Sequence, residues 1–258
     1  MWNFYNRNKV FKKLWKIGGA LLVVLFMVIT LAFTSMKYSG VLCKTVRVEY
    51  ESDDKITLNK EVIRRVVKKT DKDIVGKTFD QIDAEKLEAA VEKQAAVFKA
   101  EVYKTVAKDS SSFSGILTVR VKHREPVVRV ITSTSSYYLD EYAHRFPVSS
   151  TYPAQVLVAT GSIDTTYAKE QLLPCVLFIT GDEFWNAQIE QVHVEPNGDI
   201  ILTPLMGDHL IELGAPDNFQ EKFRNMKAFY KQVLANRNWN KYESISLKYK
   251  NQVIAKRR

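Results

Sequence analysis

The fold is decided by the stretch ILTVRVKHREPVV, residues 116–128. Its first part places Leu117, Val119 and Val121 at every second position, with polar residues between them. This period of two is typical of a β-strand with one buried face. A second apolar run begins after Pro126 and predicts another strand over residues 127–132. We therefore place a domain boundary inside this stretch, with one domain over residues 44–123 and another over residues 124–258.

The residues before this stretch predict a small sheet covered by two helices. Lys44–Tyr50 alternates with period two and predicts a first strand. Leu58–Lys69 has apolar residues at helical spacing, and a second helix is expected to begin near Asp83, a suitable N-cap residue. Strands over Val97–Val106 and 116–123 follow, joined by a polar loop. The order β-α-α-β-β predicts a three-stranded sheet with two helices.

The residues after this stretch predict a strand-rich domain of mixed α+β class. Strands are expected over 127–132, 137–139, 155–159, 188–194, 199–204 and 209–213. Asn197-Gly198 favours a tight hairpin. Helices are expected over 166–179 and 218–234, and in the second of these Asn218 and Glu221 have capping-box spacing. Strands over 244–249 and 252–255, with a tight turn at Lys250-Asn251, end the domain.

An uncharged run of 20 residues lies over 17–36, and 11 of them are Leu, Ile, Val or Phe. A helix of this length rises about 30 Å, the thickness of a bilayer's hydrocarbon core. Residues 1–16 contain five basic residues and no acidic ones. This asymmetry predicts a single transmembrane helix with a cytoplasmic tail, and a chain that continues beyond the membrane. A cleaved signal peptide, whose apolar region is usually shorter, and a buried core helix are the alternatives.

The formal net charge of +9 does not indicate a nucleic-acid partner. Five of the 38 Lys and Arg lie in the tail, which leaves 33 against 29 Asp and Glu in the 222 residues after position 36. This balance gives the exported part no strong basic field. The two cysteines, Cys43 and Cys175, provide no disulfide framework, although a single bond between them is left open.

The sequence contains no pattern typical of catalysis, a metal or a cofactor. None of the four histidines has the spacing of a known metal site. Gly76-Lys77-Thr78 resembles the end of a phosphate-binding loop but lacks the glycine five positions earlier. The adjacent acids Asp140-Glu141 and Asp182-Glu183 would point to opposite sides of a strand. We therefore expect no enzyme active site, no metal and no cofactor.

Several short motifs occur in an order that resembles a known family. They are Gly76–Phe79 followed by Ile82-Asp83 and Leu87, Arg124–Val128, Tyr138–Asp140, Ile211–Gly214 and Ile245–Tyr249. With the basic tail and the apolar run, they resemble the FtsQ/DivIB family of bacterial cell-division proteins, and the first domain resembles a POTRA domain. The chain departs from the family at Tyr142-Ala143-His144, where a glycine is usual. It also has Lys248-Tyr249 in place of Arg-Tyr.

The resemblance implies a non-enzymatic scaffold of the division machinery that links early and late division proteins at the septum. It would be a single-pass protein of the inner membrane, with a cytoplasmic N-terminus and periplasmic domains. In this family the C-terminal sheet edge pairs with a strand of FtsB, which is coiled with FtsL, and the POTRA domain contacts other division proteins. The matching partner-binding residues in this chain are Leu247, Lys248, Tyr249, Asn251, Gln252, Val253 and Ile254.

Three alternatives remain at this point. Leu247, Tyr249 and Val253 could instead close the core of their own domain. The protein could be a POTRA-type chaperone or secretion component that grips extended clients on its strand edges. It could also be an anchored wall-remodelling enzyme that uses Asp140, Asp182 or Glu183.

Overall fold

A computed structural model describes residues 15, 17–31, 40–51, 58–108, 113–148, 154–234 and 239–258. The chain forms two compact units. The first comprises residues 1–49, 64–90 and 101–119, and the second comprises residues 50–63, 91–100 and 120–258.

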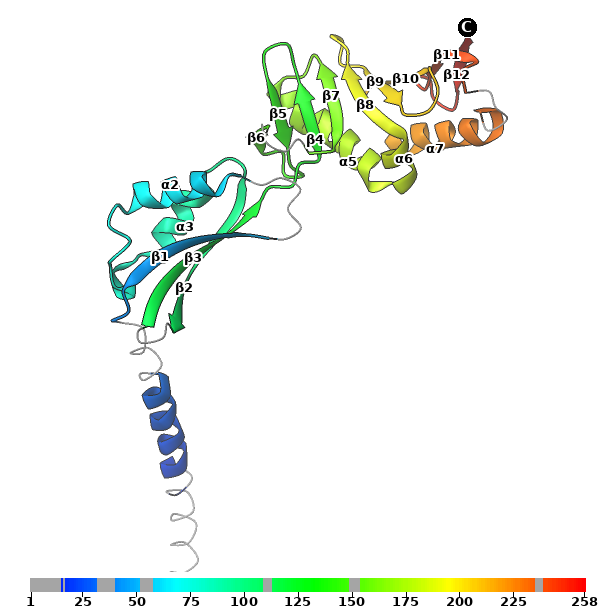
Figure 1. Ribbon diagram of the computed structural model, residues 1–258. Coiled ribbons are helices and arrows are strands. Elements are labelled where there is room, and N and C mark those ends of the chain that lie inside the picture. The colour runs from blue at the N-terminus through cyan, green and yellow to red at the C-terminus, as the bar shows by residue number, and fades with distance from the viewer. Residues whose placement is uncertain are drawn as a thin grey trace, which may run out of the picture. The chain divides into compact units, whose positions relative to one another are not determined.

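The first sheet has three strands in the order β1-β3-β2. These are β1 (Cys43–Tyr50), β2 (Val97–Lys108) and β3 (Phe113–His123). Helices α2 (Lys60–Thr70) and α3 (Ala84–Glu92), with a short 3₁₀ turn η1 (Phe79–Gln81), lie between β1 and β2 in the chain, and both helices cover one face of the sheet (Figure 1). The predicted β-α-α-β-β order is confirmed. Leu117, Val119 and Val121 are fully buried, and the Asp83 side chain accepts a hydrogen bond from the backbone N–H of Lys86 at 3.0 Å.

The second sheet has nine strands in the order β12-β11-β10-β9-β8-β7-β4-β5-β6. Their bounds are β4 (Val128–Ile131), β5 (Ser136–Leu139), β6 (Arg145–Pro147), β7 (Leu157–Gly161), β8 (Ile189–Val194), β9 (Ile200–Pro204), β10 (Leu210–Gly214), β11 (Tyr242–Ser246) and β12 (Ile254–Arg257). Strands β4, β7 and β8 are mutually parallel, and β10 is parallel to β11. The two outer strands are therefore β6 and β12.

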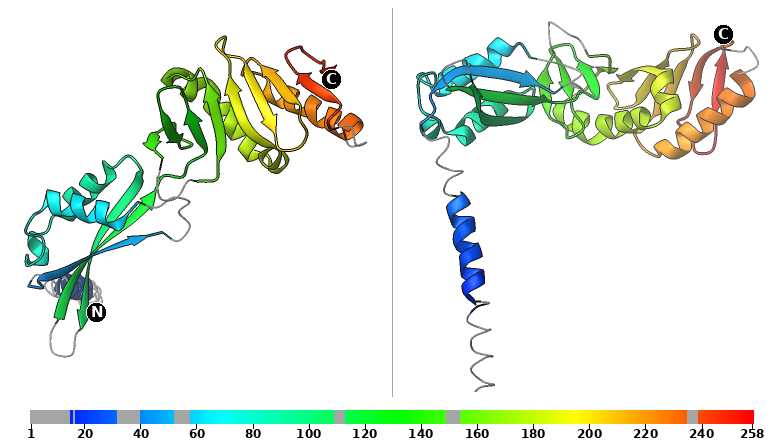
Figure 2. Two further views of the ribbon diagram at one scale, coloured as in Figure 1. Left: turned by 45° about the horizontal axis from the view of Figure 1, so that its top comes forward. Right: turned by 60° about the horizontal axis from the view of Figure 1, so that its bottom comes forward.

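Helices cover one face of this sheet (Figures 1 and 2). They are α4 (Thr165–Tyr167), the π-helical turn η2 (Ala168–Leu172), α5 (Leu173–Gly181), α6 (Glu183–Gln188), α7 (Phe219–Phe229) and the π-helical turn η3 (Tyr230–Leu234). Apolar side chains of α5, α6 and α7 pack with inward-facing residues of the strands in one core cluster. Both cysteines are buried and unpaired.

The predicted helix over 166–179 is divided into α4, η2 and α5. Pro174 lies in the first turn of α5, where a missing backbone N–H is tolerated. The capping-box prediction at the start of α7 is wrong. Asn218 has a left-handed backbone with φ of 48° and makes no side-chain cap, so Glu221 is free to bond elsewhere. Strand β6 and helix α6 were not predicted, and Gln188 ends α6 instead of beginning a strand.

Residues 17–31 are helical and their side chains are exposed, whereas residues 1–14, 16 and 32–36 of the predicted tail and span lie outside the described residues. In the ranges that the structure covers, no helix combines the length and the apolar character needed to cross a bilayer.

Candidate partner-binding edge

Strand β12 forms one outer edge of the nine-stranded sheet. It pairs with β11 in antiparallel register, with Ile254 opposite Ser246 and Ala255 opposite Ile245. No other strand in the described part of the chain pairs with β12. The candidate site is therefore the side of β12 that faces away from β11.

The backbone groups on that side can be assigned by alternation. The N–H of Arg258 donates to the carbonyl of Lys241 at 3.2 Å and therefore points toward β11. Successive residues of a strand direct their backbone groups to opposite sides. The N–H and C=O groups of Ala255 and Arg257 consequently face outward. We call these four groups the outer rim of β12.

The structure places the predicted partner-binding residues only partly on this strand. Strands β11 and β12 span 242–246 and 254–257, not 244–249 and 252–255, so only Ile254 belongs to the edge. Ile254 is 48% exposed. Leu247 is 2% exposed and belongs to the core cluster, and Val253 packs against that cluster. For these two residues the alternative of a core role fits the structure better.

Tyr249, Asn251 and Gln252 lie in the connection between the two strands. Tyr249 is 59% exposed and its backbone carbonyl accepts a hydrogen bond from the N–H of Gln252 at 3.2 Å. Asn251 has φ of 57°, a left-handed conformation that fits the predicted tight turn. Tyr249 is thus an exposed aromatic side chain held close to the edge strand.

Two contacts with distant residues hold this connection in place. The backbone N–H of Asn251 donates to Glu221 Oε1 of α7 at 3.2 Å. Lys248 Nζ donates to Asp199 Oδ2 at 2.9 Å, and this hydrogen bond raises the pKa of Lys248. Sequence reasoning missed both anchors, because 30 and 49 residues separate the partners. The spacing of Asn218 and Glu221 predicts a helix cap instead of the contact with Asn251.

A groove of about 330 Å³ lies between the beginning of α7 and this connection. Its lining includes Asp217, Glu221, Asn225, Leu247, Tyr249 and Gln252. The groove borders the connection that leads into β12, and its volume is large enough to receive a side chain of a strand added there.

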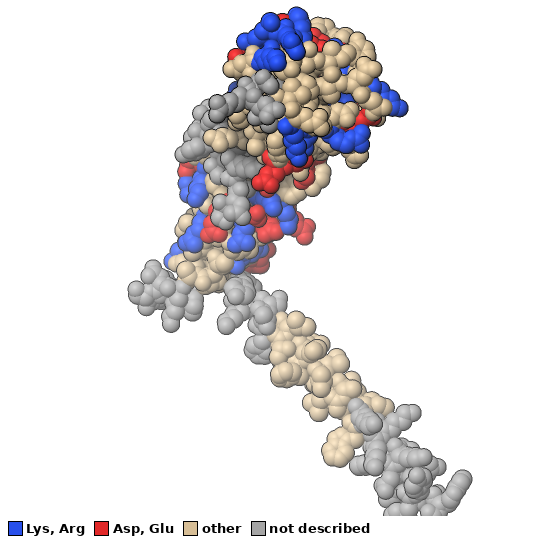
Figure 3. Space-filling model, turned by 90° about the vertical axis from the view of Figure 1, so that its right-hand side faces the viewer, with Lys and Arg blue, Asp and Glu red and all other residues tan. Residues whose placement is uncertain are grey.

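Basic side chains surround the edge. Lys250, Lys256, Arg257 and Arg258 are all exposed. Two of them have acidic partners: Lys256 forms an ion pair with Glu243 at 2.8 Å, and Arg258 forms one with Asp208 at 3.5 Å. Figure 3 shows a cluster of Lys and Arg at the top of the view, on the second unit. The edge therefore favours a partner segment that carries negative charge.

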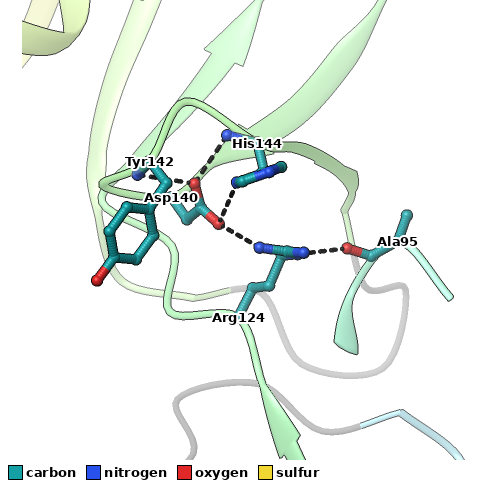
Figure 4. Close-up of polar contacts among 5 residues, drawn as sticks. All are labelled: Ala95, Arg124, Asp140, Tyr142 and His144. Carbon is teal, nitrogen blue, oxygen red and sulfur yellow. Dashed lines mark hydrogen bonds and ion pairs between the residues drawn. The ribbon is translucent and has the colours of Figure 1, made fainter. Parts of the chain in front are cut away.

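Asp140 and Asp182, two of the three acids that could have served an enzyme, have structural contacts. Asp140 is 3% exposed, and its Oδ1 accepts hydrogen bonds from the backbone N–H groups of Tyr142 at 3.0 Å and His144 at 2.7 Å. Its Oδ2 accepts from Arg124 Nη1 at 2.8 Å, and Arg124 Nε donates to the carbonyl of Ala95 at 3.1 Å (Figure 4). Asp140 thus connects the β5–β6 turn to the segment that precedes β2.

Asp182 caps α6 by accepting a hydrogen bond from the N–H of Trp185 at 3.1 Å. Across the described residues, no group of three or more His, Cys, Asp and Glu side chains is arranged to hold a metal ion. The arrangement that stands out is therefore an open sheet edge with an adjacent groove.

Comparison with known families gives two matches. A family model described as "FtsQ/DivIB, C-terminal related" matches residues 125–256. A model described as "POTRA-like domain" matches residues 41–109. No curated protein matches the chain significantly. The first match covers just over half of the chain and includes the nine-stranded sheet except Arg257, the last residue of β12.

Proposed function

Because this chain belongs to the FtsQ/DivIB family of non-enzymatic cell-division proteins, we propose that it is a division scaffold that receives a β-strand from an FtsB-like partner on β12. The FtsL-like protein would join through its coil with that partner. The POTRA-like domain would contact other division proteins. Residues 17–36 would anchor the chain in the inner membrane, with residues 1–16 in the cytoplasm and both domains in the periplasm.

The single observation that supports strand addition is the outer rim of β12. An unpaired strand edge is a ready template for another chain, and natural proteins usually blunt or cover such edges. Here the rim has Tyr249 and the groove beside it, which supply an aromatic contact and a pocket for one partner side chain. Main-chain hydrogen bonds provide affinity in such complexes, and pockets for alternate side chains provide specificity.

The test removes one rim donor without removing a bond of the protein's own sheet. Ala255→Pro deletes an outward N–H, and proline is tolerated on an outer strand when the lost N–H faces solvent. We expect this variant to unfold at nearly the wild-type temperature. It should bind the FtsB-like protein at least about ten-fold more weakly, because one backbone hydrogen bond to the added strand is lost and the proline obstructs the pairing of that strand with β12. Binding is measured with the full chain by titration calorimetry.

Tyr249→Asp tests the neighbouring aromatic contact, and Tyr142→Asp is its matched control. Both tyrosines are 59% exposed, but Tyr142 lies in the β5–β6 turn. Tyr249→Asp should weaken binding, whereas Tyr142→Asp should leave it unchanged. Wild-type affinity in both Ala255→Pro and Tyr249→Asp would refute strand addition at β12.

The client-handling alternative has one observation in its favour. Strand β2 is an outer strand of the first sheet and is 12 residues long. If extended clients bind there, Ala255→Pro leaves their binding intact, which separates the two functions.

A further inference from the structure

A second groove, of about 500 Å³, lies between α5, α6 and α7. Its floor is aromatic and comes from all three helices. The ring centroids of Phe178 and Phe223 are 5.1 Å apart, and those of Trp185 and Phe223 are 4.9 Å apart. Trp185 and Phe223 are both almost fully buried, so the packing of the core holds their rings in place. The neighbouring Phe184 is 37% exposed. The groove therefore offers a rigid apolar surface to an outside ligand.

One wall of this groove is basic. It is lined by three side chains of α7 and η3, those of Arg224, Lys227 and Lys231. Spacings of three and four residues place them on one helical face. Lys227 Nζ lies 3.8 Å from Asp182 Oδ2 and 4.8 Å from the ring centroid of Phe184. Within the described ranges, Arg224 and Lys231 have no carboxylate within ion-pair distance, so their charges are available to a ligand.

The end of the groove coincides with a change in helix type. Helix α7 continues into the π-helical turn η3, which carries Lys231 and Gln232 to the groove. Turns of this kind are rare in proteins overall, and many of those that occur lie at functional sites. The buried Tyr230 begins this turn, and its hydroxyl lies 3.1 Å from His209 Nε2. The position of Lys231 is therefore supported by contacts in the core.

We propose that this groove is a docking site for an acidic amphipathic helix of a partner protein. From Arg224 to Lys231 the helix rises about 10 Å, which is also the rise between residues i and i+7 of a bound helix. Carboxylates at those two positions would meet Arg224 and Lys231. Apolar residues at i+3 and i+4 would lie on the aromatic floor, as in other helix-in-groove complexes.

The shape of the site favours a helix over a lipid surface, because a flat bilayer cannot fill a concave groove. The lining residues of this groove and of the groove beside β12 do not overlap. The proposal therefore does not rest on strand addition, and it would permit a second partner to bind while another occupies β12.

The test is photocrosslinking in dividing cells, with the full chain carrying p-benzoylphenylalanine at Ala228. Ala228 is exposed and lines the groove. The matched control position is Gln171, which is exposed on η2 outside the groove. We expect position 228, and not position 171, to capture a protein whose crosslinked peptide is helical, amphipathic and richer in Asp and Glu than in Lys and Arg.

Charge reversal then tests the chemistry. Arg224→Glu with Lys231→Glu should lower the crosslink yield roughly ten-fold. Lys68→Glu with Lys69→Glu, on the exposed side of α2, should leave it unchanged. Arg224→Gln with Lys231→Gln should give an intermediate loss and serves as the second variant if the reversed protein unfolds. Tyr249→Asp should not affect this crosslink even if it abolishes binding at β12.

Three results would overturn the proposal. The first is an equal yield from positions 228 and 171. The second is capture of lipid, or of a peptide that is basic or not helical. The third is an undiminished crosslink in both the reversed and the neutral variants.

Discussion

The ion pair between Arg124 and Asp140 gives the sharpest prediction about stability. Arg124→Ala would leave the buried Asp140 carboxylate without its guanidinium partner, with His144 Nδ1 3.5 Å from Oδ2. Removing one partner of a buried pair costs about 3–5 kcal/mol. Asp140 keeps two backbone N–H donors after the change, and the Arg124 side chain is partly exposed. We therefore expect a smaller cost, at or just below the lower end of that range, of about 2–3 kcal/mol.

A double-mutant cycle isolates the pair. Arg124→Ala, Asp140→Ala and the double variant are compared by urea unfolding of the full chain, followed by tryptophan fluorescence. Of the four tryptophans, Trp185 lies in the core cluster of the second unit and Trp239 packs against it, so the change in their fluorescence reports the unfolding of that unit. The coupling energy should be about 2 kcal/mol, because the double variant has neither a buried charge nor an unmatched cation.

Arg129→Ala is the control for the loss of an arginine. Arg129 Nε donates to Ser136 Oγ at 3.2 Å in an exposed position, and its removal should cost less than about 1 kcal/mol. A coupling energy below about 0.5 kcal/mol, no larger than ordinary non-additivity, would show that the Arg124–Asp140 contact does not stabilise the fold.

Three further predictions concern single positions. Ala143→Gly should stabilise the chain by about 0.5–1 kcal/mol in urea unfolding, since φ at Ala143 is 63° and a left-handed backbone strains a residue with a Cβ. Burial lowers the pKa of His209 below its usual 6.5, so the unfolded chain binds the proton first and stability should fall as pH decreases below 6.5. His209→Gln should flatten this dependence in unfolding curves measured from pH 7.5 to 5. Glu221→Ala should cost about 0.5–1.5 kcal/mol by removing the acceptor for the N–H of Asn251, and should weaken binding at β12 in calorimetry.

Local sequence patterns were sufficient to predict most of the helices and strands. The alternation of Leu117, Val119 and Val121 identified β3 because one face of that strand is buried, and Asp83 caps α3 as expected. Strand β6 was missed because three residues are too few to show a period. Helix α6 was missed because its six residues follow directly on α5 with only Asp182 between them.

Long-range contacts set the details that the sequence could not provide. Leu247 has the apolar character of a strand residue, but β11 ends at Ser246 and Leu247 is buried in the core. Asn218 and Glu221 have the spacing of a cap, yet Glu221 bonds to Asn251, 30 residues away. The pairing of Lys248 with Asp199 likewise depends on the packed sheet. These contacts place the connection beside β12 and shape its groove.

The most direct test of the central claim is amide hydrogen exchange at the four residues of β12, with and without the proposed FtsB-like partner. In the free chain, the amides of Ile254 and Lys256 should exchange slowly because they face β11, whereas those of Ala255 and Arg257 should exchange rapidly. Partner binding should slow Ala255 and Arg257. Slow exchange of these two amides in the free chain, or rapid exchange in the complex, would contradict strand addition at this edge.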